Sequence, residues 1–225
     1  MDHLFLSRTI LFRGAAPEEV EAMLTCLQAE VRSYARGEVI YRAGDTVSAM
    51  GLVLSGSVSI ENDDVWGNKS ILDRVHPGQV FAETYACVPG EPLMISAVAA
   101  EPSEILFLDM GRVLHLCSSS CDFHNKLVRN LLSISSQKNL SLSRRIFHTS
   151  AKSIRGRLLS YLSFQSVQQG SREFDIPFNR QQLADYLSVD RSALSNELSK
   201  MQRDGLLRVE RSRFTLLGLN PEDIL

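Results

Sequence analysis

Four polar side chains lie close together in the segment 190–199 and have the chemistry that the base edges of duplex DNA require. Arg191 carries a planar guanidinium that can donate two parallel hydrogen bonds to a guanine. Ser192, Ser195 and Asn196 add short donors and acceptors beside it. The same residues would also suit the solvated face of an ordinary helix. Their combination favours a helix that meets the major groove of DNA.

The surrounding sequence predicts two short helices joined by a tight turn. The stretch RQQLADYLSVDRSALSNELSKMQRDGL, residues 180–206, has two apolar-periodic segments separated by a polar break, SVD. Asp190 ends the break and is well placed to cap the second helix. The apolar positions are Leu183, Ala184, Leu187, Leu194, Leu198 and Met201. Two helices joined this closely are typical of a helix-turn-helix unit.

A basic hairpin is predicted directly after these helices. The stretch GLLRVERSRFTLL, residues 205–217, is typical of two strands, with Arg208, Arg211 and Arg213 around the tip. Such a wing is suited to phosphate contact. Residues 144–225 hold 13 Lys/Arg and 9 Asp/Glu, a net charge of +4, whereas residues 1–143 hold 11 and 17, a net of −6. This asymmetry favours a polyanionic partner for the C-terminal part alone.

A second group with chemical potential is HLCSSSCDFH, residues 115–124. His115, Cys117, Cys121 and His124 are ligand types that zinc and iron accept, and the two thiols could form a disulfide. The alternative is structural, because this segment starts a long helix in which cysteine is often a small buried residue. The sequence leaves both interpretations open.

The N-terminal half predicts a β-rich domain. Residues 17–30 favour a short helix, but between 31 and 110 short β-rich runs alternate with glycines. This rhythm is typical of antiparallel strands in a sandwich or barrel. Residues 121–146 then form a long periodic segment without glycine or proline.

Two apolar stripes follow the predicted long helix. One consists of Phe123, Leu127, Leu131 and Ile134, and the other of Val128, Leu132, Ser135, Asn139, Leu142 and Ile146. Two stripes suit a helix that packs on its own domain and on a partner helix. Residues 147–153 are a plausible hinge, and residues 153–168 predict another amphipathic helix.

In its motifs and their order, the chain resembles the Crp/Fnr superfamily of bacterial transcription regulators over nearly its whole length. The N-terminal motifs are GEVIYRAGD, LVLSGSVSI and HPGQVFAE, and the C-terminal motif is the helix-turn-helix with its wing. The resemblance implies an α+β fold with a jelly-roll or β-roll sensor domain over residues 1–120. A dimerisation helix over 121–147 and a winged helix-turn-helix domain over 148–225 would follow.

The resemblance also implies a homodimer that binds a palindromic operator in double-stranded DNA, with RNA polymerase as a further candidate partner. Arg180 and Gln181 correspond to phosphate-positioning residues of the family. The family often has Glu where Ser192 stands and Arg where Asn196 stands. The operator of well-known members is therefore not expected here.

We expect the effector of this chain to differ from cAMP, because the sequence lacks one residue that cAMP-binding members of the family have. Glu83 matches the family's ribose-binding glutamate, but the position of the phosphate-binding arginine falls at or near Leu93. No Lys or Arg occurs between Arg74 and Arg112. Lys138 and Asn139 fall where the long helix of the family faces the pocket, so they are candidate effector-binding residues. We expect an unidentified small-molecule effector and name no cofactor.

Other functions are less consistent with the sequence. An enzyme of the cupin type would need a metal triad, but His76 is the only histidine between 31 and 110, and the common phosphate-loop and nucleophile motifs are missing. We therefore expect no enzyme. A regulatory module that acts on another protein, or a metal or redox sensor through Cys117 and Cys121, remains an alternative. The absence of an export signal and of an apolar run of membrane-spanning length predicts a cytoplasmic protein without membrane contact.

Overall fold

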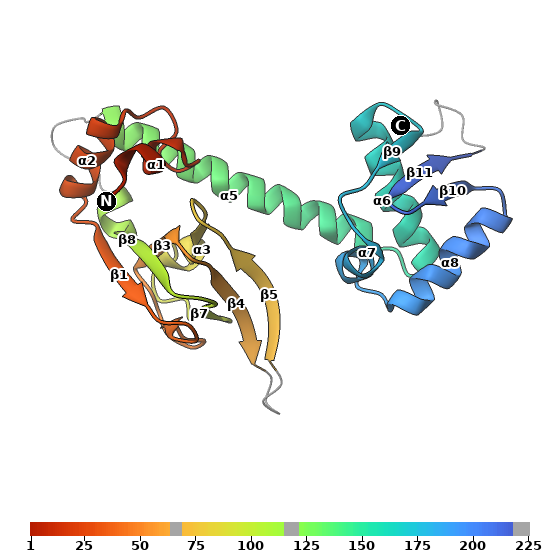
Figure 1. The fold of residues 1–225 in the computed structure, drawn as a ribbon, viewed down its shortest axis with the longest axis horizontal. Coiled ribbons are helices and arrows are strands. Elements are labelled where there is room, and N and C mark those ends of the chain that lie inside the picture. The colour runs from red at the N-terminus through yellow and green to blue at the C-terminus, as the bar shows by residue number, and fades with distance from the viewer. Residues whose placement is uncertain (64–68, 115–121, 218–225) are drawn as a thin grey trace. The chain divides into compact units, whose positions relative to one another are not determined.

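The computed structural model describes residues 1–63, 69–114 and 122–217, and its chain divides into two compact units, Met1–Gln137 and Lys138–Leu225 (Figure 1). The helices of the first unit are α1 (His3–Arg8), α2 (Pro17–Cys26), α3 (Glu83–Ala86), α4 (Met110–Leu114) and the first part of α5 (Asp122–Thr149). Its strands are β1 (Glu30–Tyr34), β2 (Val39–Tyr41), β3 (Ala49–Ser55), β4 (Val58–Asp63), β5 (Lys69–Val75), β6 (Val80–Phe81), β7 (Ser96–Ala99) and β8 (Ser103–Asp109).

Within the described residues, these strands form two antiparallel four-stranded sheets. One has the order β1-β8-β3-β6 and the other β2-β7-β4-β5. Alternation along β8 gives the first sheet two buried faces: Ile105 and Phe107 pack in the core shared with the second sheet, whereas Leu106 and Leu108 pack with the helices. The predicted β-roll is therefore confirmed, as is the α+β organisation of the chain.

Gly51 on β3 is required by close packing in this core. A Cβ atom at this position would lie 2.3 Å from the ring of Phe81 on β6. The ring also packs edge-on against Tyr41, which in turn contacts Phe107. Aromatic side chains thus fill much of the space between the two sheets, and burial raises the pKa of Tyr41 to about 12.

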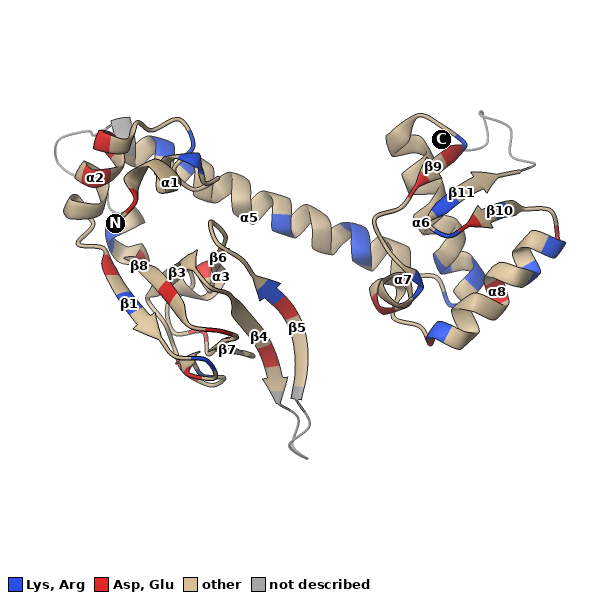
Figure 2. Ribbon diagram, in the orientation of Figure 1, with Lys and Arg blue, Asp and Glu red and all other residues tan. Residues whose placement is uncertain are grey.

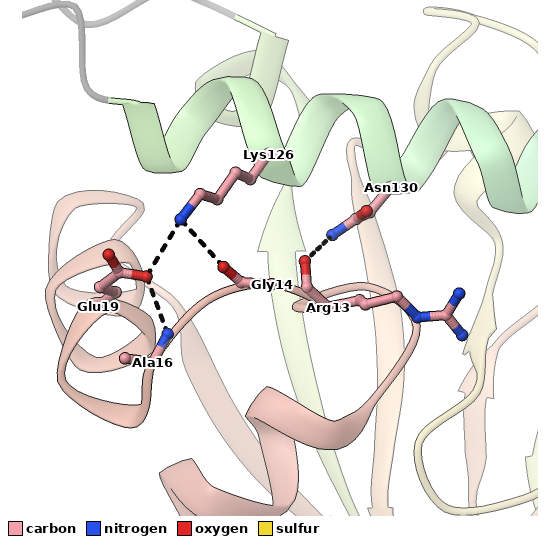
Figure 3. A network of polar contacts seen from close by, with 6 residues as sticks. All are labelled: Arg13, Gly14, Ala16, Glu19, Lys126 and Asn130. Atoms are coloured by element: carbon pink, nitrogen blue, oxygen red, sulfur yellow. Dashed lines mark hydrogen bonds and ion pairs between the residues drawn. The ribbon is translucent and has the colours of Figure 1, made fainter.

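The first part of α5 is fixed to the N-terminal segment of the same unit. Leu127, Leu131 and Ile134 are buried in the core with α1 and α2, which confirms the predicted inner stripe for these three residues. Lys126 donates to the carbonyl of Gly14 and lies 3.4 Å from the Glu19 carboxylate (Figure 3).

The next turn of α5 also binds the N-terminal segment. The amide of Asn130 donates to the carbonyl of Leu11 at 3.0 Å. It also donates to the carbonyl of Arg13 at 2.9 Å (Figure 3). The α2 helix ends at Cys26, whereas the sequence predicted a helix over 17–30. It ends there because Gln28 takes a positive φ of 50° and β1 begins at Glu30.

The second unit is a winged helix-turn-helix. It contains the end of α5, α6 (Ile154–Gln169), β9 (Glu173–Asp175), α7 (Arg180–Leu187), α8 (Arg191–Arg203), β10 (Leu207–Glu210) and β11 (Arg213–Leu216). The predicted hairpin is present, and β9 adds a third strand to it in the order β10-β11-β9. No helix among the described residues is long and apolar enough to cross a membrane.

One core holds the second unit together. It is formed by buried apolar residues of three helices and of the wing: Leu158 and Leu162 of α6, Leu183, Ala184 and Leu187 of α7, Leu194, Leu198 and Met201 of α8, and Phe214 of β11. The predicted apolar faces of α7 and α8 are therefore confirmed. The predicted domain boundaries, after residues 120 and 147, stay predictions.

Candidate nucleic-acid interface

The helix-turn-helix forms because its local sequence stops one helix and starts the next within three residues. Asn179 caps α7, and Gln182 reaches back to the backbone of Asn179, which completes a capping box. The helix ends at Ser188, which takes a left-handed φ of 54°. Asp190 then caps α8 by accepting a hydrogen bond of 2.9 Å from the Ala193 backbone.

The cap of α8 also involves a residue predicted to contact bases. The hydroxyl of Ser192 donates to the carboxylate of Asp190. This bond, followed by that from the Ala193 backbone, lowers the pKa of Asp190, so the cap stays charged at neutral pH. A base contact by Ser192 would have to share or replace its bond to Asp190.

The outer face of α8 presents the other predicted base-contacting residues. Arg191 and Asn196 are exposed, and Ser195 is half-buried. The side chains of Arg191 and Asn196 form no hydrogen bond or ion pair within the described part of the chain. Basic residues recur along α8 and on the wing (Figure 2). Two donors on one rigid helix face therefore have unused hydrogen-bonding capacity.

Two arginines and a glutamine predicted to contact phosphate already have partners. The guanidinium of Arg180 lies over the Phe214 ring, 5.4 Å from its centroid, and burial lowers the pKa of Arg180. Gln181 donates to the Asp185 carboxylate at 2.8 Å, one turn along α7. Arg213 forms an exposed ion pair with Glu173 of β9 at 2.7 Å.

The tip of the wing carries an exposed cation. Glu210 pairs with Arg213, so Arg211 and Ser212 make a two-residue turn. Arg211 has a positive φ of 56° and is exposed, as is Arg208 on β10. The strands place both arginines on a projecting hairpin, where phosphate contact is sterically open.

Contacts that the sequence did not predict fix α8 against α6. Arg155, at the start of α6, binds Glu197 at 2.6 Å and Asp204 at 2.7 Å, which are on α8 and at its C-cap. These hydrogen bonds and charges raise the pKa of Arg155. Arg155 and Glu197 are 42 residues apart in the chain, so no local spacing pattern in the sequence could reveal their contact.

The candidate effector residues of the first unit are buried. Glu83 begins α3 directly after Ala82, which has a positive φ of 60°, and its exposure is only 3%. Burial, followed by the charge of Glu83, raises the pKa of Cys87 one turn later. Leu93 is 5% exposed, and its backbone bonds to Gly44 and Asp45.

The remaining candidates are Lys138, Asn139 and the metal or redox residues. Lys138 and Asn139 are exposed on α5 and belong to the second unit. Of the metal or redox candidates, His115, Cys117 and Cys121 lie outside the described residues. His124 is 5% exposed, and its Nε2 atom is buried without a hydrogen-bond partner. The described residues contain no group of three or more potential metal ligands.

In the comparison with known proteins, two parts of this chain each match a protein family. The family described as "Cyclic nucleotide-binding domain" matches residues 31–120, and the "Crp-like helix-turn-helix domain" family matches residues 156–221. The two matches cover the β-roll and the winged helix-turn-helix, respectively.

Similar proteins are regulators. A "Cyclic AMP receptor protein" of Thermus thermophilus is 39% identical over 98 residues, which is 44% of this chain and 44% of that protein. A "CRP-like cAMP-activated global transcriptional regulator" of Mycobacterium tuberculosis is 21% identical over 93% of this chain and 92% of its own length. The crystal structure of the Thermus thermophilus catabolite activator protein, 24% identical, has a TM-score of 0.51 and covers 92% of this chain and 93% of its own. This last likeness supports the fold.

Proposed function

The chain belongs to the Crp/Fnr family of bacterial transcription regulators, and we propose that it acts as a homodimer whose two α8 helices read a palindromic operator. Its Crp-like helix-turn-helix is a DNA-binding element, and the similar proteins are regulators rather than enzymes. The exposed face of α8 carries the proposal. Arg191 and Asn196 project from a helix that is fixed on its other side by a buried core.

The proposed reading of DNA separates the residues into two classes. Arg191, Ser195 and Asn196, with Ser192 after it leaves Asp190, contact base edges and choose the sequence. Arg211 contacts phosphate and positions the unit without choosing the sequence. Arg180, Gln181 and Arg213 belong to the second class, and each also contacts a residue of its own chain in this structure.

The second apolar stripe of α5 supports the homodimer. Leu132, Leu142 and Ile146 are 65%, 61% and 69% exposed. Leucine and isoleucine this exposed, repeated along a helix, favour a second copy of the same helix as the partner. A two-fold dimer would present its two α8 helices with the symmetry of a palindrome.

The proposed effector is a small molecule other than cAMP, bound in the first unit near Glu83. The position where the family supplies an arginine for the cyclic phosphate is at or near Leu93, which is buried. A buried phosphate without a cation would lose its strongest hydrogen bonds. Two of the similar proteins have cAMP in their names, so the proposal separates this chain from them. Lys138 and Asn139 are candidate contacts from α5.

Titration of the full-length protein with cAMP by calorimetry tests the effector proposal. The expected result is no heat of binding at micromolar concentrations. Micromolar affinity for cAMP would refute it and would direct attention to a cation that reaches the pocket from elsewhere.

Mobility shifts with fragments of bacterial genomic DNA, in low salt and then with increasing nonspecific competitor, test the DNA-binding proposal. We expect a few fragments to remain bound when competitor has removed the rest. If all fragments are displaced equally, the protein has no operator among them and the proposal of sequence-specific binding is wrong. A cytoplasmic location and an interaction with RNA polymerase stay predictions.

A further inference from the structure

The C-terminal end of α7 is occupied by arginine side chains from outside the helix-turn-helix. The last carbonyls of an α-helix have no partner within the helix and carry its negative dipole end. Arg145, in the last turns of α5, donates from Nη2 to the carbonyl of Asp185 at 3.0 Å. It donates from Nε to the carbonyl of Tyr186 at 3.1 Å.

The next two carbonyls are bound by a second arginine. Arg157 of α6 donates from Nη1 to the carbonyls of Leu187 and Ser188, both at 3.0 Å. These residues form the turn that leads into α8. Four consecutive carbonyls, from 185 to 188, therefore accept hydrogen bonds from two guanidinium groups.

Arg157 also binds the connector between α5 and α6. Its Nε atom donates to the carbonyl of Ala151 at 2.9 Å. One planar guanidinium thus joins residues 150–153 to the turn of the helix-turn-helix. A lysine could not make these three contacts in the same geometry, because its single ammonium lacks the fixed fork of donors.

The end of α5 is packed onto the same surface. His148 is 1% exposed, and its Nδ1 atom lies 2.9 Å from the hydroxyl of Tyr186. Its ring packs edge-on against Tyr161 of α6. The segment 147–153, which the sequence indicates as a hinge, is helical up to Thr149 and is held on both sides of that residue.

We propose that Arg145 and Arg157 are positioning residues for α8: they lock the helix-turn-helix to the end of α5 and to the connector. A displacement of the last turns of α5 would then also displace α8, because these hydrogen bonds fix the connector, residues 150–153, to the helix-turn-helix. Arg145 donates from Nε and Nη2 and Arg157 from Nε and Nη1 to backbone carbonyls, and the proposal gives neither residue a phosphate contact. This inference rests on the proposed DNA-binding function, but half of its test does not depend on DNA.

The test compares the full-length protein with Arg157→Ala, Arg157→Lys, Arg145→Ala and the control Arg129→Ala, which removes an exposed arginine from the first part of α5. Hydrogen exchange of peptides covering 150–154 and 186–190 is measured without DNA. We expect about tenfold faster exchange in both segments for Arg157→Ala, a smaller increase for Arg157→Lys, and no change for the control.

The dissociation constant for an operator, measured over a range of salt concentrations, gives the second readout. For Arg157→Ala we expect about tenfold weaker binding with an unchanged salt slope, since no phosphate contact is lost. Unchanged exchange in either segment overturns the proposal, as does a salt slope reduced by about one.

The two proposals fail in different ways. If the wild-type protein binds no DNA, the proposed function fails and hydrogen exchange alone decides the positioning role. If Arg157→Ala does not fold, Arg145→Ala decides it, because Arg145 is exposed and its side chain, within the part of the chain that the structure describes, donates to two carbonyls of α7 and lies over the Tyr186 ring. Exchange at 186–190 that equals that of Arg129→Ala would then overturn it.

Discussion

Replacing Leu142 with alanine should weaken the proposed dimer while leaving each unit folded. Leu142 is 61% exposed on α5, so most of its side chain gains no burial within one chain. Full burial of a leucine side chain contributes about 1.5–3 kcal/mol, and the exposed part leaves about 1–2 kcal/mol to be gained at an interface. A two-fold interface uses the residue twice. We therefore expect a loss of about 2–4 kcal/mol per dimer, or about 30- to 900-fold in the dimer dissociation constant.

Sedimentation equilibrium over a range of protein concentrations measures this constant. The matched control is Leu4→Ala, which truncates a leucine that is 52% exposed on another helix, α1. The control should leave the monomer–dimer equilibrium unchanged. Circular dichroism of both variants checks that α5 still forms. If Leu142→Ala and Leu4→Ala associate equally well, the exposed stripe of α5 is not the dimer interface.

Four further variants test other parts of the account. Arg191→Ala should cost about 1–3 kcal/mol on the operator and relax one base position, whereas Arg211→Ala should weaken all duplexes alike and lower the salt slope by about one, as read by fluorescence anisotropy. Leu194→Ala, at a fully buried position, should cost about 2–5 kcal/mol in urea denaturation of the second unit. Burial, followed by the charge of Arg144, lowers the pKa of His148. The folded protein therefore binds this proton less tightly than the unfolded chain, and the free energy of unfolding should decrease as the pH drops below the ordinary histidine pKa of about 6.5. His148→Asn should reduce this loss of stability between pH 7.5 and pH 5.5.

The helix-turn-helix could be predicted from the sequence because its signals are local. The cap at Asp190 and the apolar spacing of Leu194, Leu198 and Met201 lie within one short segment, and the structure places each as expected. The β-roll was also predicted from its glycines and short strands. The inner stripe of α5 was predicted because Leu127 and Leu131 repeat with the period of a helix.

Contacts between distant segments could not be predicted in this way. Arg157 looks like any basic residue on an amphipathic helix, and only the fold brings its guanidinium to Leu187, 30 residues later. The pairing of β9 with β11 and the burial of His148 depend on the same long-range packing. The sequence indicated polar residues for the proposed DNA-binding face, but it did not indicate the bonds that Gln181 and Ser192 form within the chain.

Selection of bound sites from random duplex DNA by the full-length protein tests the central claim most directly. If two α8 helices read DNA as a symmetric pair, the enriched sites will be inverted repeats whose half-sites are centred about 10 base pairs, or about 34 Å, apart. Enrichment of single asymmetric sites, or no enrichment at low salt, would contradict the account.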